Sequence, residues 1–281
     1  MTTPRLIKNL PPGEYHAIRA LSASMALSMV EECPLLAWTQ SAFNPNAAPD
    51  NKPAFDIGSA LHLAVLEPGE FAARTVLHHF DDYRTAESKR TRDDAYASRR
   101  TPLKPTEADM VERLRASVMA DLDIAARLAR PGDAEVSLTW EWNGVECKAR
   151  PDFLPDDRSF VIDLKSAVTA HPDALGRKAM VEGWHVRASW YLGAVEAVTG
   201  TRPERYLFAV AEKKAPHIAQ LYEMDERALA RGDQIIKRAL DLFAECQRTG
   251  VWPKYRQGIS TISLPGWSEF HYADREEAGE L

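Results

Sequence analysis

The chain has 281 residues, of which 45% are hydrophobic and 27% charged, and these proportions are typical of a folded globular protein. Its three cysteines, Cys33, Cys147 and Cys246, lie far apart, which fits neither a disulfide framework nor a clustered zinc or iron-sulfur site. No apolar run approaches the roughly 18 residues that span a bilayer, and the first residues lack the apolar stretch of a signal peptide. We therefore expect a soluble cytosolic protein with reduced thiols.

The net charge of −6 argues against a uniformly basic surface for binding phosphates. One segment, 84–104, departs from this average because it carries seven basic residues and three acidic ones. It allows two interpretations, a solvated helix or mobile loop, or an arm that contacts phosphates. The second interpretation assigns the contacts to four arginines in this segment: Arg90, Arg92, Arg99 and Arg100.

Helical patterns dominate the first part of the chain. Hydroxyl caps, prolines and apolar stripes predict helices over about 25–32, from Pro34, over 56–66 and over about 106–130. His62 lies in the middle of the third helix, and Pro131-Gly132 ends the fourth. We thus expect a mainly helical front over residues 1–130.

From Ala134 the spacing of apolar residues changes to that of strands. The predicted elements are strands at 135–142, 145–154 and 159–167, a helix at 183–200, strands at 205–212 and 217–224, and a helix at 225–249. The order predicts a mixed α/β fold in which helices flank a mixed central sheet. We expect a single domain over 1–281, with the sheet in 131–223 and the last helix and a tail in 224–281.

Two short motifs carry the chemistry of this sheet. Pro151-Asp152 closes one predicted strand, and eleven positions after Asp152 the next strand ends in Asp163-Leu164-Lys165. Asp163 and Lys165 are two apart and so share a face of a strand, and a hairpin brings Asp152 beside them. Hard cations such as Mg²⁺ take oxygen ligands, so the two carboxylates and the Leu164 carbonyl predict a metal site.

An Asp-x-Lys sequence alone usually means surface charge. Here an apolar strand, Phe160-Val161-Ile162, delivers both residues after a hairpin that ends in Pro-Asp. In such a site a metal polarises a phosphodiester, and Lys165 positions or deprotonates the attacking water. The pattern as a whole therefore favours a catalytic site.

This arrangement resembles the PD-(D/E)xK nuclease superfamily and, more narrowly, the RecE-like (exonuclease VIII-type) phage exonucleases, which share a core with lambda exonuclease and RecB-type nucleases. The similarity covers most of the chain. Besides the Asp-x-Lys core it includes YHAIRALSAS, Cys33-Pro34, G-x-x-x-H-x-x-x-L-E-P at Gly58 to Pro68, AVAEKKAP, and WPKY…SLPGW.

The resemblance implies a role for several further residues. It places His62 at the metal with Asp152 and Asp163, and because imidazole suits Mn²⁺ better than Mg²⁺, we expect both ions to support activity. Glu135 matches an acidic position near the metal, although an ordinary charge at a strand edge is an equal alternative. The superfamily often carries Gln-x-x-x-Tyr after the Asp-x-Lys strand. Tyr191 keeps the second position, whereas Arg187 replaces the glutamine and either grips a phosphate or forms a structural salt bridge.

The activity that the resemblance implies is resection of double-stranded DNA from its ends, 5′ to 3′, leaving a 3′ single strand. It also implies a ring-shaped homo-oligomer, a trimer or tetramer, a RecT-like annealing protein as partner, and a phage or prophage gene expressed in bacterial cytoplasm. Three alternatives remain open: a structure-specific or restriction-type endonuclease, a non-catalytic nucleic-acid-binding module, and a hydrolase of small phosphoesters.

Overall fold

The structure is a computed structural model that describes residues 3–47, 56–256 and 258–281. The N-terminal half contains β1 (Arg5–Ile7), α1 (Pro12–Ala17), α2 (Ala23–Glu31), α3 (Pro34–Thr39), α4 (Asp56–Leu66), α5 (Phe71–Arg74), β2 (Thr75–Leu77), α6 (Ala86–Ala97), β3 (Thr101–Leu103), α7 (Pro105–Ala120) and α8 (Leu122–Leu128). The remainder contains β4 (Gly132–Ala134), β5 (Ser137–Trp142), β6 (Val145–Ala149), β7 (Phe153–Pro155), β8 (Phe160–Ala167), α9 (Pro172–Val181), α10 (Trp184–Thr199), β9 (Arg205–Glu212), β10 (Ala219–Tyr222), α11 (Glu226–Thr249) and α12 (Trp267–Glu277).

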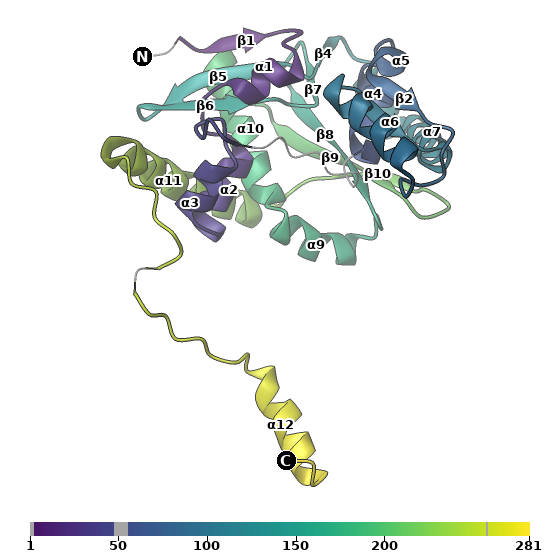
Figure 1. The fold of residues 1–281 in the computed structure, drawn as a ribbon. Coiled ribbons are helices and arrows are strands. Elements are labelled where there is room, and N and C mark those ends of the chain that lie inside the picture. The colour runs from purple at the N-terminus through teal and green to yellow at the C-terminus, as the bar shows by residue number, and fades with distance from the viewer. Residues whose placement is uncertain (1–2, 48–55, 257) are drawn as a thin grey trace.

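A five-stranded mixed sheet forms the centre of the molecule, in the order β10-β9-β8-β7-β4. Strands β8 and β9 are parallel, since α9 and α10 connect them, and the other neighbours are antiparallel. Helices cover both faces of the sheet (Figure 1). The predicted mixed α/β fold is therefore confirmed.

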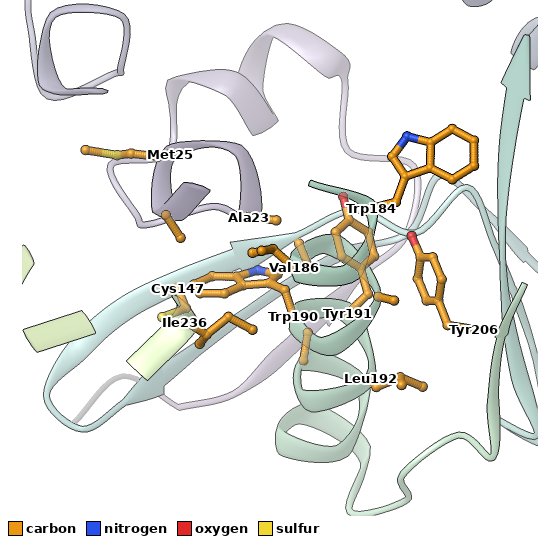
Figure 2. Close-up of a cluster of buried hydrophobic side chains, with 14 of the residues drawn as sticks. Ala23, Met25, Cys147, Trp184, Val186, Trp190, Tyr191, Leu192, Tyr206 and Ile236 are labelled. Atoms are coloured by element: carbon orange, nitrogen blue, oxygen red, sulfur yellow. The ribbon is translucent and has the colours of Figure 1, made fainter. Parts of the chain in front are cut away.

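Alternate residues of β8 face opposite layers of helices, as expected for a strand. Ile162 and Leu164 pack with Leu61 of α4 and Leu114 of α7 in one apolar cluster. Val161 belongs to the cluster on the other face, to which α10 contributes Trp184 and Trp190 (Figure 2). Asp163 and Lys165 share the face of Val161, so α10 lies over the Asp-x-Lys motif.

A second sheet, β1-β5-β6, has three strands. One long hairpin supplies both sheets: its outer arms β4 and β7 pair in the five-stranded sheet, and its inner arms β5 and β6 pair in the smaller one. The chain bends between the sheets at Glu135, whose φ is +50°, and at 150–152 on the returning arm. The prediction of one strand over 145–154 and of a strand opening at Glu135 is wrong, because the hairpin changes sheets at these positions.

The predicted helix over 106–130 is divided at Asp121. This residue has ψ of 114° and its carboxylate accepts a hydrogen bond from the backbone N–H of Ile124 at 2.9 Å, so it begins α8 as an N-cap. The division leaves the apolar stripe intact, since Leu114, Val118 and Ile124 all pack beneath the sheet.

The segment 84–104 holds the helix α6, and a helix was part of the first of its two interpretations. Several other elements were not predicted, among them α9 between β8 and α10. The tail holds α12, which lies apart from the rest of the molecule at the end of an extended segment (Figure 1). All three cysteines are buried and unpaired. Among the described helices, none combines the length and the apolar character needed to cross a membrane.

Candidate metal centre and active site

The site begins where strand pairing ends. Strand β7 pairs with β8 through Phe153 and Ile162, whereas β8 continues to Ala167. Beyond this pair the backbone of Leu164 is bound by side chains. Its N–H donates to Oδ2 of Asp152 at 2.6 Å, and its carbonyl accepts from the Nε2–H of His62 at 2.7 Å. Side chains from the bend that precedes β7 and from α4 thus take the place of a neighbouring strand.

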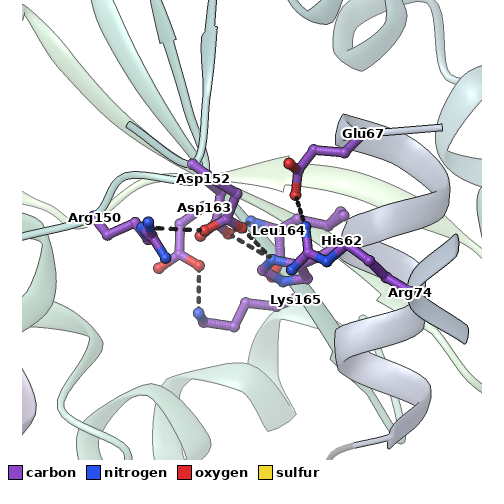
Figure 3. Close-up of polar contacts among 9 residues, drawn as sticks. His62, Glu67, Arg74, Arg150, Asp152, Asp163, Leu164 and Lys165 are labelled. Atoms are coloured by element: carbon purple, nitrogen blue, oxygen red, sulfur yellow. Dashed lines mark hydrogen bonds and ion pairs between the residues drawn. The ribbon is translucent and has the colours of Figure 1, made fainter. Parts of the chain in front are cut away.

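Three potential metal ligands converge at this edge. Nδ1 of His62 lies 3.4 Å from Oε1 of Glu135 and 3.6 Å from Oδ2 of Asp152. One ligand atom from each residue lies within 4.8 Å of the other two. His62 comes from α4, Glu135 from the first bend of the hairpin and Asp152 from the second, and Figure 3 shows His62 and Asp152 turned toward each other. Two carboxylates and an imidazole form a donor set that fits Mg²⁺ or Mn²⁺.

The bend at Glu135 is what places its carboxylate in this group. A positive φ is uncommon outside glycine and persists only where surrounding contacts hold it. Here the backbone N–H of Glu135 donates to the carbonyl of Asp152 at 3.0 Å, so the two bends of the hairpin are tied together. Irregular positions of this kind re-aim side chains next to active sites.

The charges of the cluster shift its pKa values. Burial by itself lowers the pKa of His62, but the carboxylates of Asp152 and Glu135 raise it to about 9. Burial raises the pKa of Asp152, and the imidazole of His62 opposes that rise. His62 therefore carries a positive charge that partly neutralises the carboxylates of Asp152 and Glu135. A bound divalent cation would neutralise the same carboxylates.

Asp163 is held by a separate set of partners. Its Oδ1 accepts from the ammonium of Lys165, and its Oδ2 accepts from the hydroxyl of Tyr206 at 2.8 Å and lies 3.6 Å from Nε of Arg187. Burial alone would raise the pKa of Asp163, yet Lys165 and Arg187 hold it well below its usual range. Asp163 is also near enough for its charge to raise the pKa of Asp152.

The structure thus brings together the residues predicted for the core of the site, with three differences from the predicted set. Asp163, predicted as a metal ligand, lies outside the group of three potential ligands, and its oxygens face Lys165, Tyr206 and Arg187. Glu135 was predicted only to lie near the metal, but the structure places its carboxylate among the potential ligands themselves. The Leu164 carbonyl, predicted as a metal ligand, accepts the hydrogen bond of His62. Arg187 forms the salt bridge that was one of its two interpretations.

A groove of about 1940 Å³ opens beside the cluster. His62, Glu135 and Asp152 line it together with Arg187 and Tyr191. Eight lysine and arginine residues line the groove against five aspartate and glutamate residues, so it is basic within an acidic chain. Burial raises the pKa of Tyr191 to about 12, and its hydroxyl therefore stays protonated.

Three of the four arginines predicted in the segment 84–104 line this groove: Arg92, Arg99 and Arg100. Arg90 is exposed and lies outside the groove lining within the described chain. The guanidinium of Arg92 pairs with Asp93 at 2.7 Å, and Arg100 donates to the carbonyl of Thr75 at 2.6 Å.

Sequence reasoning missed two residues of the groove wall, Lys148 and Arg150. The buried ammonium of Lys148 donates to the carbonyls of Tyr15 and Ile18 at 3.1 and 2.8 Å, which holds α1 against the hairpin. Arg150 lies over the ring of Tyr15 at 4.6 Å and is 4.0 Å from Glu135. Burial lowers the pKa of Lys148 to about 8. The sequence signal that could have revealed them is the presence of two basic residues, Lys148 and Arg150, in the predicted strand 145–154.

Comparison with models of protein families identifies the family of this chain. A model described as "PDDEXK-like domain of unknown function (DUF3799)" matches residues 22–264. The chain belongs to this family. The family thereby confirms the PD-(D/E)xK superfamily that the two acidic motifs predicted, and it supports a nuclease that uses divalent metal.

One solved structure supports the fold. A crystal structure named "Putative exonuclease", from Eubacterium rectale, aligns with a TM-score of 0.63 and 14% identity over 91% of this chain and 94% of that one. At this identity the likeness shows the fold alone. A second structure, SSO0001, aligns over 66% of this DUF3799 chain and 86% of its own with 15% identity and a TM-score of 0.29, too low to support an argument. No curated protein matches the chain.

Proposed function

We propose that this chain is a divalent-metal-dependent exonuclease that resects double-stranded DNA from its ends, 5′ to 3′, and leaves 3′ single strands. The observation that carries the proposal is the cluster of His62, Glu135 and Asp152 on a basic groove, beside Asp163 and Lys165. Family membership supports phosphodiester hydrolysis. The resemblance of the motifs to RecE-like nucleases supports the end-directed reaction and its polarity.

We assign the metal to His62, Glu135 and Asp152. Asp163 and the Leu164 carbonyl lie next to this group and would supply further oxygens to a bound cation. When bound, a divalent cation polarises a phosphodiester and lowers the pKa of water. The Nε2–H of His62 is held by the Leu164 carbonyl, so the ring presents Nδ1 to the carboxylates. A backbone acceptor on the second nitrogen is how metal-binding imidazoles are commonly oriented.

Lys165 and the groove residues act on the substrate itself. Asp163 holds the ammonium of Lys165, which orients the attacking water and offsets charge on the phosphate. Tyr191 and Arg187 line the groove next to the acidic cluster and contact the DNA strand there. Arg92, Arg99 and Arg100 contact phosphates along the groove, a task that arginine performs through its planar fork.

We further infer the setting in which this activity works. The RecE-like resemblance supports a ring-shaped trimer or tetramer that threads DNA, a RecT-like annealing protein as partner, and a phage or prophage gene in a bacterial cytoplasm. In such a ring, groove arginines face the duplex while the acidic surface faces outward, which reconciles a net charge of −6 with DNA binding.

Digestion of linear duplexes labelled at either the 5′ or the 3′ end tests the proposal. We expect release of the 5′ label with Mg²⁺, retention of the 3′ label in the single strands that remain, and release of neither label with chelator. A covalently closed circle serves as the matched substrate without ends and stays intact. Cleavage of the circle would identify an endonuclease. Retention of both labels with Mg²⁺ and Mn²⁺ would leave a binding module or a hydrolase of small phosphoesters, which a chromogenic phosphoester distinguishes.

A further inference from the structure

Tyr206 on β9 meets the Asp-x-Lys motif from the neighbouring strand. Its hydroxyl donates to Oδ2 of Asp163 at 2.8 Å, and the residue is only 3% exposed. In the parallel register Tyr206 lies opposite Val161, and Phe208 lies opposite Asp163. Because side chains alternate along a strand, all four share the face that α10 covers.

The ring of Tyr206 has a fixed position. It meets Phe208 and Tyr191 edge to face, with centroid distances of 5.0 and 5.8 Å. Figure 2 shows Tyr206 beside Tyr191, between the sheet and α10. A phenol has two side-chain torsions, and packing of this kind removes the freedom of both. The hydroxyl is therefore presented to Asp163 by rigid elements.

The two oxygens of Asp163 have different partners. Oδ1 accepts from Lys165, and Oδ2 accepts from Tyr206 and faces the guanidinium of Arg187. Both cations are on flexible side chains, so neither alone fixes the plane of the carboxylate. The hydroxyl of Tyr206, by contrast, belongs to a ring whose position is fixed by packing. Because this hydroxyl binds Oδ2 of Asp163, Oδ1 is left to accept from Lys165.

We propose that Tyr206 is a positioning residue of the nuclease site, which fixes the Asp163 carboxylate so that Oδ1 holds Lys165 and the charge of Asp163 faces the metal cluster. The inference rests on the proposed function and adds a residue to its machinery. A buried phenol needs an acceptor in any fold, but a neutral oxygen is enough. The half-buried Tyr222 shows this by donating to the backbone carbonyl of Ala170 and to Gln220. Tyr206 instead takes the carboxylate of the motif.

The substitution Tyr206→Phe removes one hydroxyl and keeps the ring. We expect kcat on linear duplex to fall 10- to 100-fold, as for other groups that orient metal-site residues, with KM for DNA unchanged within about twofold. Mn²⁺ affinity, measured by calorimetry without DNA, falls about tenfold or more. Tyr222→Phe is the matched control, since it also deletes a phenol hydroxyl, and it leaves both quantities unchanged. Mn²⁺ affinity of Tyr206→Phe within about twofold of wild type would overturn the proposal.

A double-mutant cycle covers the case in which Tyr206→Phe mainly weakens the fold. Urea unfolding is measured for the wild type, Tyr206→Phe, Asp163→Ala and the double variant. If Tyr206 acts through Asp163, the cost of removing the hydroxyl falls by at least about half in the Asp163→Ala background. Equal costs in the two backgrounds refute the inference. Because calorimetry and unfolding need no DNA, they decide on Tyr206 even if the wild-type protein degrades none.

Discussion

The Nε2–H of His62 donates to the carbonyl oxygen of Leu164 across 2.7 Å and so joins α4 to β8. This bond directs the other ring nitrogen, Nδ1, toward Glu135 and Asp152. A histidine that was assigned to the metal through family resemblance is thus oriented by the backbone of the Asp-x-Lys strand itself.

Replacing His62 tests the imidazole as a ligand. We expect His62→Ala to lower Mg²⁺-dependent kcat by about 100-fold or more. Loss of one ligand weakens metal binding, and it leaves the carboxylates of Glu135 and Asp152 without the imidazole that contacts them. Mn²⁺ should restore part of the activity. The exposed His79 offers a control, and His79→Ala should behave as wild type. Unchanged kinetics of His62→Ala in Mg²⁺ would make His62 a structural residue.

Asp163 is the second target. Asp163→Ala removes the acceptor of Lys165 and Tyr206, and we expect activity to fall below detection while circular dichroism still reports a folded protein. Some loss of stability is expected, since Lys165 and Arg187 are left without their carboxylate. Asp241→Ala breaks a surface pair with Lys237 and should change neither property. Full activity in Asp163→Ala would remove Asp163 from the site.

Glu135 distinguishes a metal ligand from an ordinary charge at a strand edge. Glu135→Gln keeps the shape of the side chain, so we expect the bend to persist while Mn²⁺ affinity falls about tenfold or more by calorimetry. The exposed Glu204 provides the comparison, with no change expected for Glu204→Gln. Equal affinity in both variants would restore the view of Glu135 as a bystander.

Asp56 at the start of α4 predicts a pH dependence of stability. Burial raises its pKa to about 6, and the residue is 6% exposed. A carboxyl whose pKa is raised on folding stabilises the protein fully below its unfolded value near 3.8 and loses that contribution as pH rises through about 6.

Asp56→Asn keeps an acceptor for the hydroxyl of Tyr96 and cannot ionise. Relative to wild type, its unfolding free energy should be similar near pH 4 and higher by up to about 3 kcal/mol above pH 7. Urea denaturation at several pH values measures the difference. A difference that stays constant with pH would show that Asp56 does not titrate in this range.

Alanine substitutions at two helical glycines test close packing at one position and helix propensity at the other. A Cβ at Gly232 of α11 would lie 2.4 Å from the carbonyl oxygen of His185, whereas one at Gly176 of α9 meets nothing within 4 Å. Gly232→Ala should therefore destabilise by about 2 kcal/mol through forced separation of α10 and α11. Gly176→Ala should stabilise by up to about 1 kcal/mol. Thermal unfolding that ranks the two variants in the opposite order would contradict this packing.

The chemistry of the site was more visible in the sequence than its geometry. An apolar strand that ends in Asp163 and Lys165 and a preceding Pro-Asp predicted the core of the site, and the structure places these groups together. Tyr206 was hidden because strand periodicity reports which face a residue takes and is silent about which neighbour it meets across strands. Family resemblance, in turn, was needed for His62.

The bend of the hairpin also escaped prediction. Polar and apolar residues alternate in the sequence from Val145 to Phe153, so the change of sheet leaves no mark on the pattern. The structure buries nearly every side chain of β6 and β7 whatever its polarity. The positive φ of Glu135 falls on a residue type that rarely adopts it. The break at Asp121 was obscured in the same way, because Leu114, Val118 and Ile124 face one apolar cluster across it.

The hairpin that belongs to both sheets has a consequence for protection against hydrogen exchange. Glu135 and Asp152 are its two bends, so any fluctuation that opens the pairing of β5 with β6 also disturbs the distance between these carboxylates. A cation that binds both must then suppress that opening by mass action. Amide protons as far away as Trp142, at the tip of the hairpin, should therefore exchange more slowly when Mn²⁺ is added.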